Sequence, residues 1–179
     1  MILKSEDEIQ FIKELVWSIR DVAGNLAEAG VFEGDSAEII REKANGKKLF
    51  LFDTFEGFIE KQILNGEPYK KGDLSVSYQQ VQEKFKNNDK VRIFRGDVVE
   101  TKDYISNENF AFIHLDLDIY QPTKACLDFF YPRLSVGGIL LIDDYCPTNW
   151  GIIKAVNEFI VEHNLELKRG VSRLAYIKK

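Results

Sequence analysis

The chain has 179 residues, of which 45% are hydrophobic, and this length and composition suit a single domain with a substantial core. Its formal net charge is -5 and it has no basic stripe, which argues against nucleic acid as the main partner. It shows no signal peptide and no apolar run long enough to span a membrane. The two cysteines, Cys126 and Cys146, form no disulfide framework, so we expect a cytoplasmic protein.

Helical and extended patterns alternate along the chain. Residues 1–24 predict an N-terminal helix, because Ser5 and Glu8 have capping-box spacing and apolar residues then recur at helical spacing up to Val22. Further helices are predicted at residues 36–44, 77–87, 122–131 and 150–163. Strands are predicted at residues 26–31, 48–52, 91–95, 110–116, 139–142, 165–168 and 174–177. Residues 54–74 predict a long mobile loop of the kind that covers active sites.

This alternation predicts an α/β fold with a doubly wound, mostly parallel sheet and helices on both faces. The last two strands flank Gly170 as a hairpin, which would place an antiparallel strand at the C-terminus. We expect Gly137 and Gly138 to form a tight turn before strand 139–142. Because there is no internal repeat or low-complexity linker, we expect residues 1–179 to form one domain.

Two apolar runs end in carboxylates. Residues 112–118 read Phe-Ile-His-Leu-Asp-Leu-Asp, and residues 139–145 read Ile-Leu-Leu-Ile-Asp-Asp-Tyr. Ligands of open α/β sheets bind at the carboxyl ends of the strands, so two neighbouring strands of this kind would gather their carboxylates at one mouth. Like charges that close repel each other, which favours a hard divalent cation between them. We therefore predict a metal site formed by Asp116, Asp143 and Asp144.

His114 and Asp118 lie two residues from Asp116, on the same side of an extended strand. We interpret Asp118 as an acid beside the metal ligands or as a cap at the start of the next helix. His114 fits a core histidine better than a catalytic base. The simpler alternative for each strand-end aspartate is a cap on the following segment, but a double Asp at the second of two strand ends favours the metal.

A turn rich in glycine and acids follows the first strand. Residues 28–36 read Glu-Ala-Gly-Val-Phe-Glu-Gly-Asp-Ser, and a glycine there lets the backbone approach a ligand closely. The acids Glu33 and Asp35 disfavour a pyrophosphate and suit a ligand with positive charge. By itself, this segment fits a purely structural turn as well as it fits a ligand-binding turn.

Asp53 ends the second strand, about twenty residues after that turn, where an acid typically holds the hydroxyls of a ribose. Its alternative role is a helix cap or a solvated loop acid. The turn and the acid together indicate a nucleoside site. Gly96 and Asp97 follow the third strand, where an adenine edge would lie, although a plain turn explains them nearly as well.

These motifs resemble those of the macrocin O-methyltransferase family, a group of class I S-adenosylmethionine-dependent methyltransferases. The similar segments occur in the same order as in the family, from about residue 22 to about residue 162. They are residues 28–36, 49–57 (which include Asp-Thr-Phe-Glu-Gly), 114–120 with 122–123, 130–138 and 142–145.

The resemblance implies a seven-stranded class I methyltransferase fold and S-adenosylmethionine as the cofactor. By the family pattern, the methionine end of the cofactor lies against Glu28, Gly30 and Gly34, and Asp53 holds its ribose. The other cofactor contacts that we expect are Ser36, Thr54, Gly96 and Asp97.

The resemblance also implies Mg²⁺ at Asp116, Asp143 and Asp144. Related catechol O-methyltransferases carry a lysine base three residues after the first metal aspartate, and this chain has Ile119 there. That base is therefore absent, and Asp116 becomes the best candidate to accept the proton, with His114 in reserve.

We therefore expect Mg²⁺-assisted methyl transfer to a hydroxyl of a small molecule, a sugar or natural product by family analogy. Two hypotheses from other classes stay open: a glycosyltransferase, because Asp116-Leu117-Asp118 fits an Asp-x-Asp metal motif, and a non-catalytic cofactor-binding domain. A nicotinamide enzyme is disfavoured because the turn lacks Gly-x-Gly-x-x-Gly. The sequence leaves the oligomeric state open, and a homodimer is compatible with it.

Overall fold

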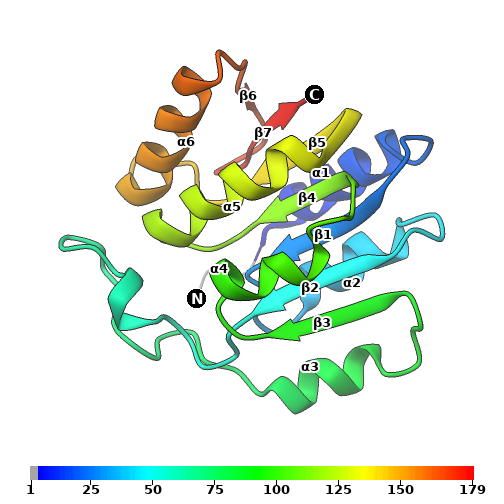
Figure 1. Cartoon of the computed structure of the whole chain (residues 1–179), viewed down its shortest axis with the longest axis horizontal. Coiled ribbons are helices and arrows are strands. Elements are labelled where there is room, and N and C mark those ends of the chain that lie inside the picture. The colour runs from blue at the N-terminus through cyan, green and yellow to red at the C-terminus, as the bar shows by residue number, and fades with distance from the viewer. Residues whose placement is uncertain (1–3) are drawn as a thin grey trace.

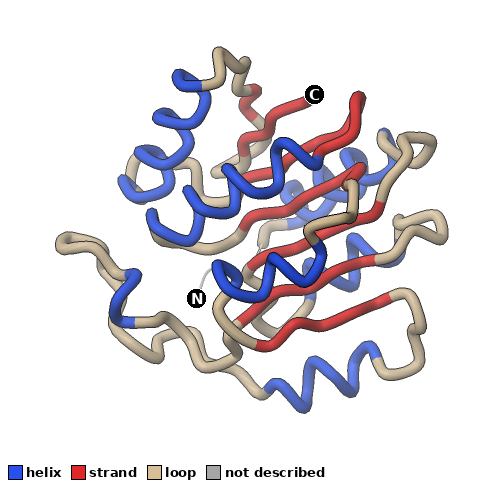
Figure 2. Tube along the Cα trace, viewed as in Figure 1, coloured by secondary structure: helices blue, strands red, loops and turns tan. Residues whose placement is uncertain are grey.

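A computed structural model describes residues 4–179. Its strands form one seven-stranded sheet in the order β3-β2-β1-β4-β5-β7-β6 (Figures 1 and 2). The strands are β1 (Asn25–Ala29), β2 (Leu49–Asp53), β3 (Val91–Arg95), β4 (Phe110–Leu115), β5 (Leu134–Ile142), β6 (Lys168–Arg169) and β7 (Ala175–Lys178). β1 to β5 are parallel, and β7 runs antiparallel to both β5 and β6. The predicted doubly wound sheet with an antiparallel C-terminal strand is confirmed.

Helices cover both faces of the sheet (Figure 1). The core on one face packs under α1 (Glu6–Ser18), α2 (Asp35–Glu42) and α3 (Tyr78–Phe85). The core on the other face packs under α4 (Val98–Thr101), α5 (Tyr120–Arg133) and α6 (Trp150–Glu162). Because side chains alternate along a strand, Phe50 and Phe52 of β2 enter one core and Leu49 and Leu51 enter the other. The remaining helical segments are the short 3₁₀ turns η1 (Glu60–Gln62) and η2 (Lys102–Ile105).

The start of α1 is fixed by the predicted capping box. The Glu8 backbone N–H donates to Ser5 Oγ at 3.3 Å, and the Ser5 backbone N–H donates to Glu8 Oε2 at 2.7 Å. The helix buries Ile12 and Val16 completely, so its position follows the core. It ends at Ser18 rather than at Val22, because the chain continues in turns closed by backbone hydrogen bonds.

Gly137 and Gly138 lie inside β5, so the prediction of a tight turn before this strand was wrong. Gly137 has a φ of 83°, and a Cβ at Gly138 would lie 2.9 Å from the carbonyl oxygen of Ala111. The pairing of β4 with β5 is irregular there. The glycines therefore permit a close approach of two strands instead of a chain reversal.

The segment that follows Asp97 forms α4 and η2, which the sequence did not predict. Each has four residues, so neither shows a full apolar period that a pattern could reveal. Within residues 4–179, none of the helices has the length and apolar character needed to cross a bilayer.

Gly30 brings the turn after β1 against the end of β4. Its φ is 87°, and a Cβ built on it would lie 1.7 Å from the carbonyl oxygen of Asp116. No side chain fits there without moving the backbone. The close contact therefore joins the first predicted cofactor motif to the first predicted metal aspartate.

We predict that Gly30→Ala lowers the free energy of unfolding by about 2–5 kcal/mol, the sum of a left-handed backbone penalty and the steric overlap. Gly46→Ala is the matched control, because Gly46 also has a positive φ, 78°, but its nearest contact would be Lys90 Nζ at 3.8 Å. That variant should lose only about 1–2 kcal/mol. Urea denaturation measures both, and equal losses would contradict the close contact.

Candidate active site

A cavity of about 820 Å³ opens at the carboxyl ends of the parallel strands. Its walls come from the segments that follow β1 to β5, together with part of the loop at residues 54–74. β1 and β4 are neighbours at the centre of the sheet, where the strand order reverses, and ligands of such sheets bind at this switch point. The volume suits a small-molecule site.

Most of the predicted cofactor residues line this cavity: Gly30, Ser36, Asp53, Thr54, Gly96 and Asp97. Among the residues described, the other two lie outside its lining. Glu28 is fully buried within β1. Gly34 is the N-cap of α2 and packs against Phe85 and Lys84. The structure therefore brings six of the eight predicted cofactor residues to one cavity, and their contact with a cofactor stays a prediction.

Asp53 organises the turn after β1. Its Oδ2 accepts hydrogen bonds from the backbone N–H groups of Val31 and Phe32, both at 2.8 Å, and its Oδ1 accepts one from Phe55 N–H at 2.7 Å. Burial raises the pKa of Asp53 above its ordinary value, and these three donors oppose that rise. A carboxylate offers about four lone-pair sites, so a ribose would share this group with the turn.

Asp97 is the N-cap of α4, and its Oδ1 accepts from Val99 N–H at 2.9 Å. The side-chain amide of Gln62 donates to both of its oxygens, also at 2.9 Å. Gln62 belongs to the loop at residues 54–74, so this contact ties the loop to the predicted adenine end of the cavity. The carboxylate holds the loop and caps the helix, and its contact with adenine stays a prediction.

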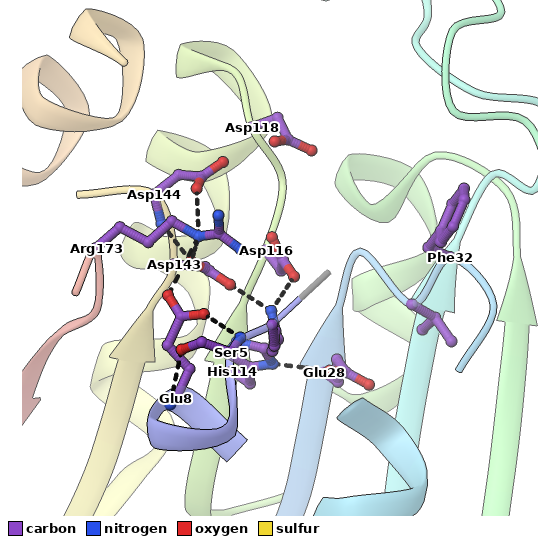
Figure 3. Close-up of polar contacts among 12 residues, drawn as sticks. Ser5, Glu8, Glu28, Phe32, His114, Asp116, Asp118, Asp143, Asp144 and Arg173 are labelled. Carbon is purple, nitrogen blue, oxygen red and sulfur yellow. Dashed lines mark hydrogen bonds and ion pairs between the residues drawn. The ribbon is translucent and has the colours of Figure 1, made fainter. Parts of the chain in front are cut away.

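Carboxylates gather at the ends of β4 and β5 (Figure 3), but among the described residues the predicted ligands Asp116, Asp143 and Asp144 do not form one group, and Asp143 lies outside the cavity lining. Oxygens of Asp116, Asp118 and Asp144 lie within 4.8 Å of one another, as do ligand atoms of His114, Asp116 and Asp143. Asp118 and Asp144 have φ values of 61° and 57°, in the left-handed region that non-glycine residues seldom adopt. Strained backbone of this kind is concentrated at functional sites.

Two cations that the sequence analysis did not identify hold this acidic cluster together. Arg173 Nε lies 2.9 Å from Oδ1 of both Asp143 and Asp144, and Figure 3 shows its guanidinium between these groups and Glu8. Lys4 Nζ lies 2.8 Å from Asp116 Oδ2 and also contacts Asp143 Oδ2. No local pattern marks either residue, and only the need to balance buried acids could have suggested such partners.

The acids differ in how readily they hold a proton. Burial raises the pKa of Asp116 to about 6, the charge of Asp143 adds to the rise, and Lys4 opposes it. Burial and the charge of Asp116 raise the pKa of Asp118 well above its ordinary value. Burial also raises the pKa of Asp143, but the nearby positive charges, Lys4 foremost, together outweigh it and lower that pKa to about 2. Asp143 is therefore the firmly ionised member of the cluster.

His114 lies in the core beneath the cavity. It and Glu28 are fully buried, and its Nδ1 lies 2.7 Å from Glu28 Oε1. Among the described residues its Nε2 has no hydrogen-bond partner. His114 lies outside the cavity lining. Its position therefore does not support direct contact with an acceptor, and its role as a reserve base stays a prediction.

The loop at residues 54–74 reaches across to the segments after β4 and β5. Glu67 Oε1 accepts from Tyr120 N–H at 2.7 Å, and Tyr69 O–H donates to Asp118 Oδ1 at 3.1 Å. The indole N–H of Trp150 donates to the carbonyl of Gly66 at 3.1 Å. Three contacts thus tie the loop over the acidic side of the cavity, and its predicted motion stays untested.

The model of the macrocin O-methyltransferase (TylF) family matches residues 6–171. The chain belongs to this family. A tetracenomycin 4'-O-methyltransferase from Streptomyces olivaceus, which acts on a dimethoxy-rhamnosyl derivative, is 32% identical over 161 residues, covering 80% of this chain and 60% of that protein. A demethyldecarbamoylnovobiocin O-methyltransferase from Streptomyces niveus is 27% identical over 168 residues, covering 82% and 62%. The chain thus spans roughly three fifths of the length of these two curated relatives.

Solved methyltransferase structures share the fold. The calicheamicin methyltransferase CalS11 superposes with a TM-score of 0.81 at 23% identity, covering 95% of this chain and 77% of that one. An O-methyltransferase from Bacillus cereus, solved in complex with S-adenosylhomocysteine (SAH), gives 0.71 at 16% identity, covering 99% and 83%. These likenesses confirm the predicted class I methyltransferase fold.

We predict that Arg173→Met lowers the free energy of unfolding by about 3 kcal/mol, because it removes one of the two cations paired with buried Asp143 and leaves Lys4 alone to compensate that charge. Asp143 is the critical partner, with 1% of its side chain exposed. Lys154→Met is the control, since Lys154 and Glu158 form an exposed pair at 3.9 Å. It should cost less than about 1 kcal/mol in thermal or urea unfolding. A loss in Arg173→Met no larger than in the control would exclude the structural role of Arg173.

Proposed function

We propose that this macrocin O-methyltransferase family member transfers a methyl group from S-adenosylmethionine to a hydroxyl of a small molecule, with a sugar or glycosylated natural product as the acceptor class. The contact between Gly30 and the Asp116 backbone carries the proposal. A cofactor whose methionine end lies on Gly30 would present its methyl group beside the acidic cluster. Both relatives named above act, by their names, on natural products, and one of these carries a rhamnosyl sugar.

The protein's part in this reaction is to position and deprotonate the acceptor, because the sulfonium of the cofactor is already a strong electrophile. Gly30 lets the backbone approach the methionine end, while Asp53 and Asp97 line the regions proposed for ribose and adenine. Asp116 lines the cavity next to Gly30, so we assign it as the group that takes the proton from the acceptor hydroxyl.

The acidic cluster fits a hard divalent cation in its donor chemistry. Carboxylate oxygens from two neighbouring strand ends lie within 4.8 Å of one another, and oxygen is the ligand atom that Mg²⁺ prefers. We propose that Asp116, Asp143 and Asp144 hold the metal, with Asp118 beside them. A metal bound there would lower the pKa of the acceptor hydroxyl and orient it.

The loop at residues 54–74 would exclude water during the transfer. It is tied through Glu67 to Tyr120 and through Tyr69 to Asp118, and both contacts must open for an acceptor to reach the acids from that side. Excluding water strengthens electrostatic interactions inside a site. We therefore propose that this loop opens and closes with each turnover.

We propose a cytoplasmic location, since Cys126 and Cys146 are both free thiols, and a homodimer stays an expectation.

The glycosyltransferase hypothesis loses support, because family membership accounts for both acidic strand ends. A non-catalytic cofactor-binding domain would bind the cofactor without turnover, which the second of the following experiments tests.

We predict that calorimetric titration detects SAH binding and that Asp53→Asn weakens it at least about tenfold, because the neutral amide loses one acceptor toward a ribose. Asp128→Asn, an exposed change on α5, is the control and should bind like the wild type. Unchanged affinity in Asp53→Asn would remove Asp53 from the cofactor site. Absence of binding in the wild type would remove the cofactor proposal.

We predict that Asp144→Asn lowers methyl transfer in the presence of Mg²⁺ at least about 100-fold, while SAH affinity changes less than about threefold. The variant loses a carboxylate of the metal cluster and none of the cofactor contacts. Transfer of radiolabelled methyl groups to a panel of glycosylated acceptors measures the rate. Full activity in this variant, or in wild type treated with a chelator, would refute metal assistance.

A further inference from the structure

Lys4 places its ammonium within the proposed metal site. Its Nζ lies 2.8 Å from Asp116 Oδ2 and also contacts Asp143 Oδ2. The Lys4 side chain is only 14% exposed and that of Asp143 only 1% exposed. This is a buried arrangement in which one cation joins the ends of two neighbouring strands.

The fold sets the position of Lys4. The residue immediately precedes the Ser5–Glu8 capping box, and the helix that follows is anchored through fully buried Ile12 and Val16. The ammonium is therefore delivered to the acids by the start of a packed helix.

An ammonium group and a divalent metal ion both bind to carboxylate oxygens of these acids. The ammonium is a compact positive charge that donates hydrogen bonds to carboxylate oxygens, and a hard metal ion is coordinated by the same oxygens. Lys4 occupies Oδ2 of both Asp116 and Asp143, so a metal held by these two carboxylates would compete with it. Arg173 differs, because it pairs with the Oδ1 atoms of Asp143 and Asp144.

We propose that Lys4 is a resident cation of this site and competes with a divalent metal for Asp116 and Asp143. Metal binding then displaces the Lys4 side chain from the acids, and the Lys4 contacts set how tightly the metal binds. The proposal rests on the metal site proposed above and is independent of the methyl acceptor. Without metal, Lys4 keeps the two strand ends together.

Manganese titration followed by electron paramagnetic resonance tests the competition on wild type, Lys4→Met and Lys13→Met. Lys13→Met is the matched control, because it removes the same charge from α1 itself, at a residue whose nearby acid is Glu42. We expect Lys4→Met to lower the Kd for Mn²⁺ at least about tenfold and Lys13→Met to change it less than about twofold. Mn²⁺ affinity in Lys4→Met equal to or weaker than in the wild type would overturn the proposal.

Amine acetylation of the wild type, read by peptide mass spectrometry, tests displacement directly and needs no variant to fold. We expect Lys4 to be protected without metal and modified at saturating Mn²⁺, while Lys13 reacts equally in both states. Protection of Lys4 that persists at saturating Mn²⁺ would overturn the proposal, as would the absence of any Mn²⁺ binding. SAH titration of the same samples separates the two ideas: if Lys4 is exposed by metal but SAH does not bind, only the methyltransferase proposal fails.

Discussion

Repulsion among the carboxylates at the ends of β4 and β5 is the constraint that determines which cations the rest of the site must supply. Leu115 pairs with Ile142 in the register of these strands, so the residues that follow, Asp116 and Asp143, emerge side by side. Two such charges in a buried place need cations. The antiparallel hairpin contributes Arg173 and the start of α1 contributes Lys4, so both ends of the fold are tied electrostatically to its centre.

The same strand end also connects the acids to the proposed cofactor region. Gly30 packs against the backbone of Asp116, and Asp53 holds the turn that contains Gly30 through backbone N–H groups. A substitution of Gly30 or Asp53 would therefore alter both the proposed cofactor region and the acidic cluster. Through these contacts the proposed cofactor region and the acidic cluster share one cavity, which the loop at residues 54–74 also lines.

The sequence could predict most helices and strands and the acidic cluster, because each depends on residues close together in the chain. Apolar runs ending in Asp116 and Asp143 mark strand ends, and parallel strands bring their ends to one edge. It could not predict the cations, since Lys4 lies 112 residues from Asp116 and Arg173 lies 30 residues from Asp143. Such pairs depend on tertiary packing. The prediction of a turn at Gly138 was wrong for the same reason, because the close approach of Gly138 to Ala111 is a contact between strands.

A crystal structure of the protein grown with SAH and Mn²⁺, with anomalous data collected at the manganese edge, tests the central claim most directly. The account predicts a manganese peak coordinated by Asp116, the Lys4 side chain turned away from the acids, and the methionine end of SAH against Gly30. A manganese peak away from the strand ends, or SAH bound elsewhere than in the cavity at the carboxyl edge of the sheet, would contradict it.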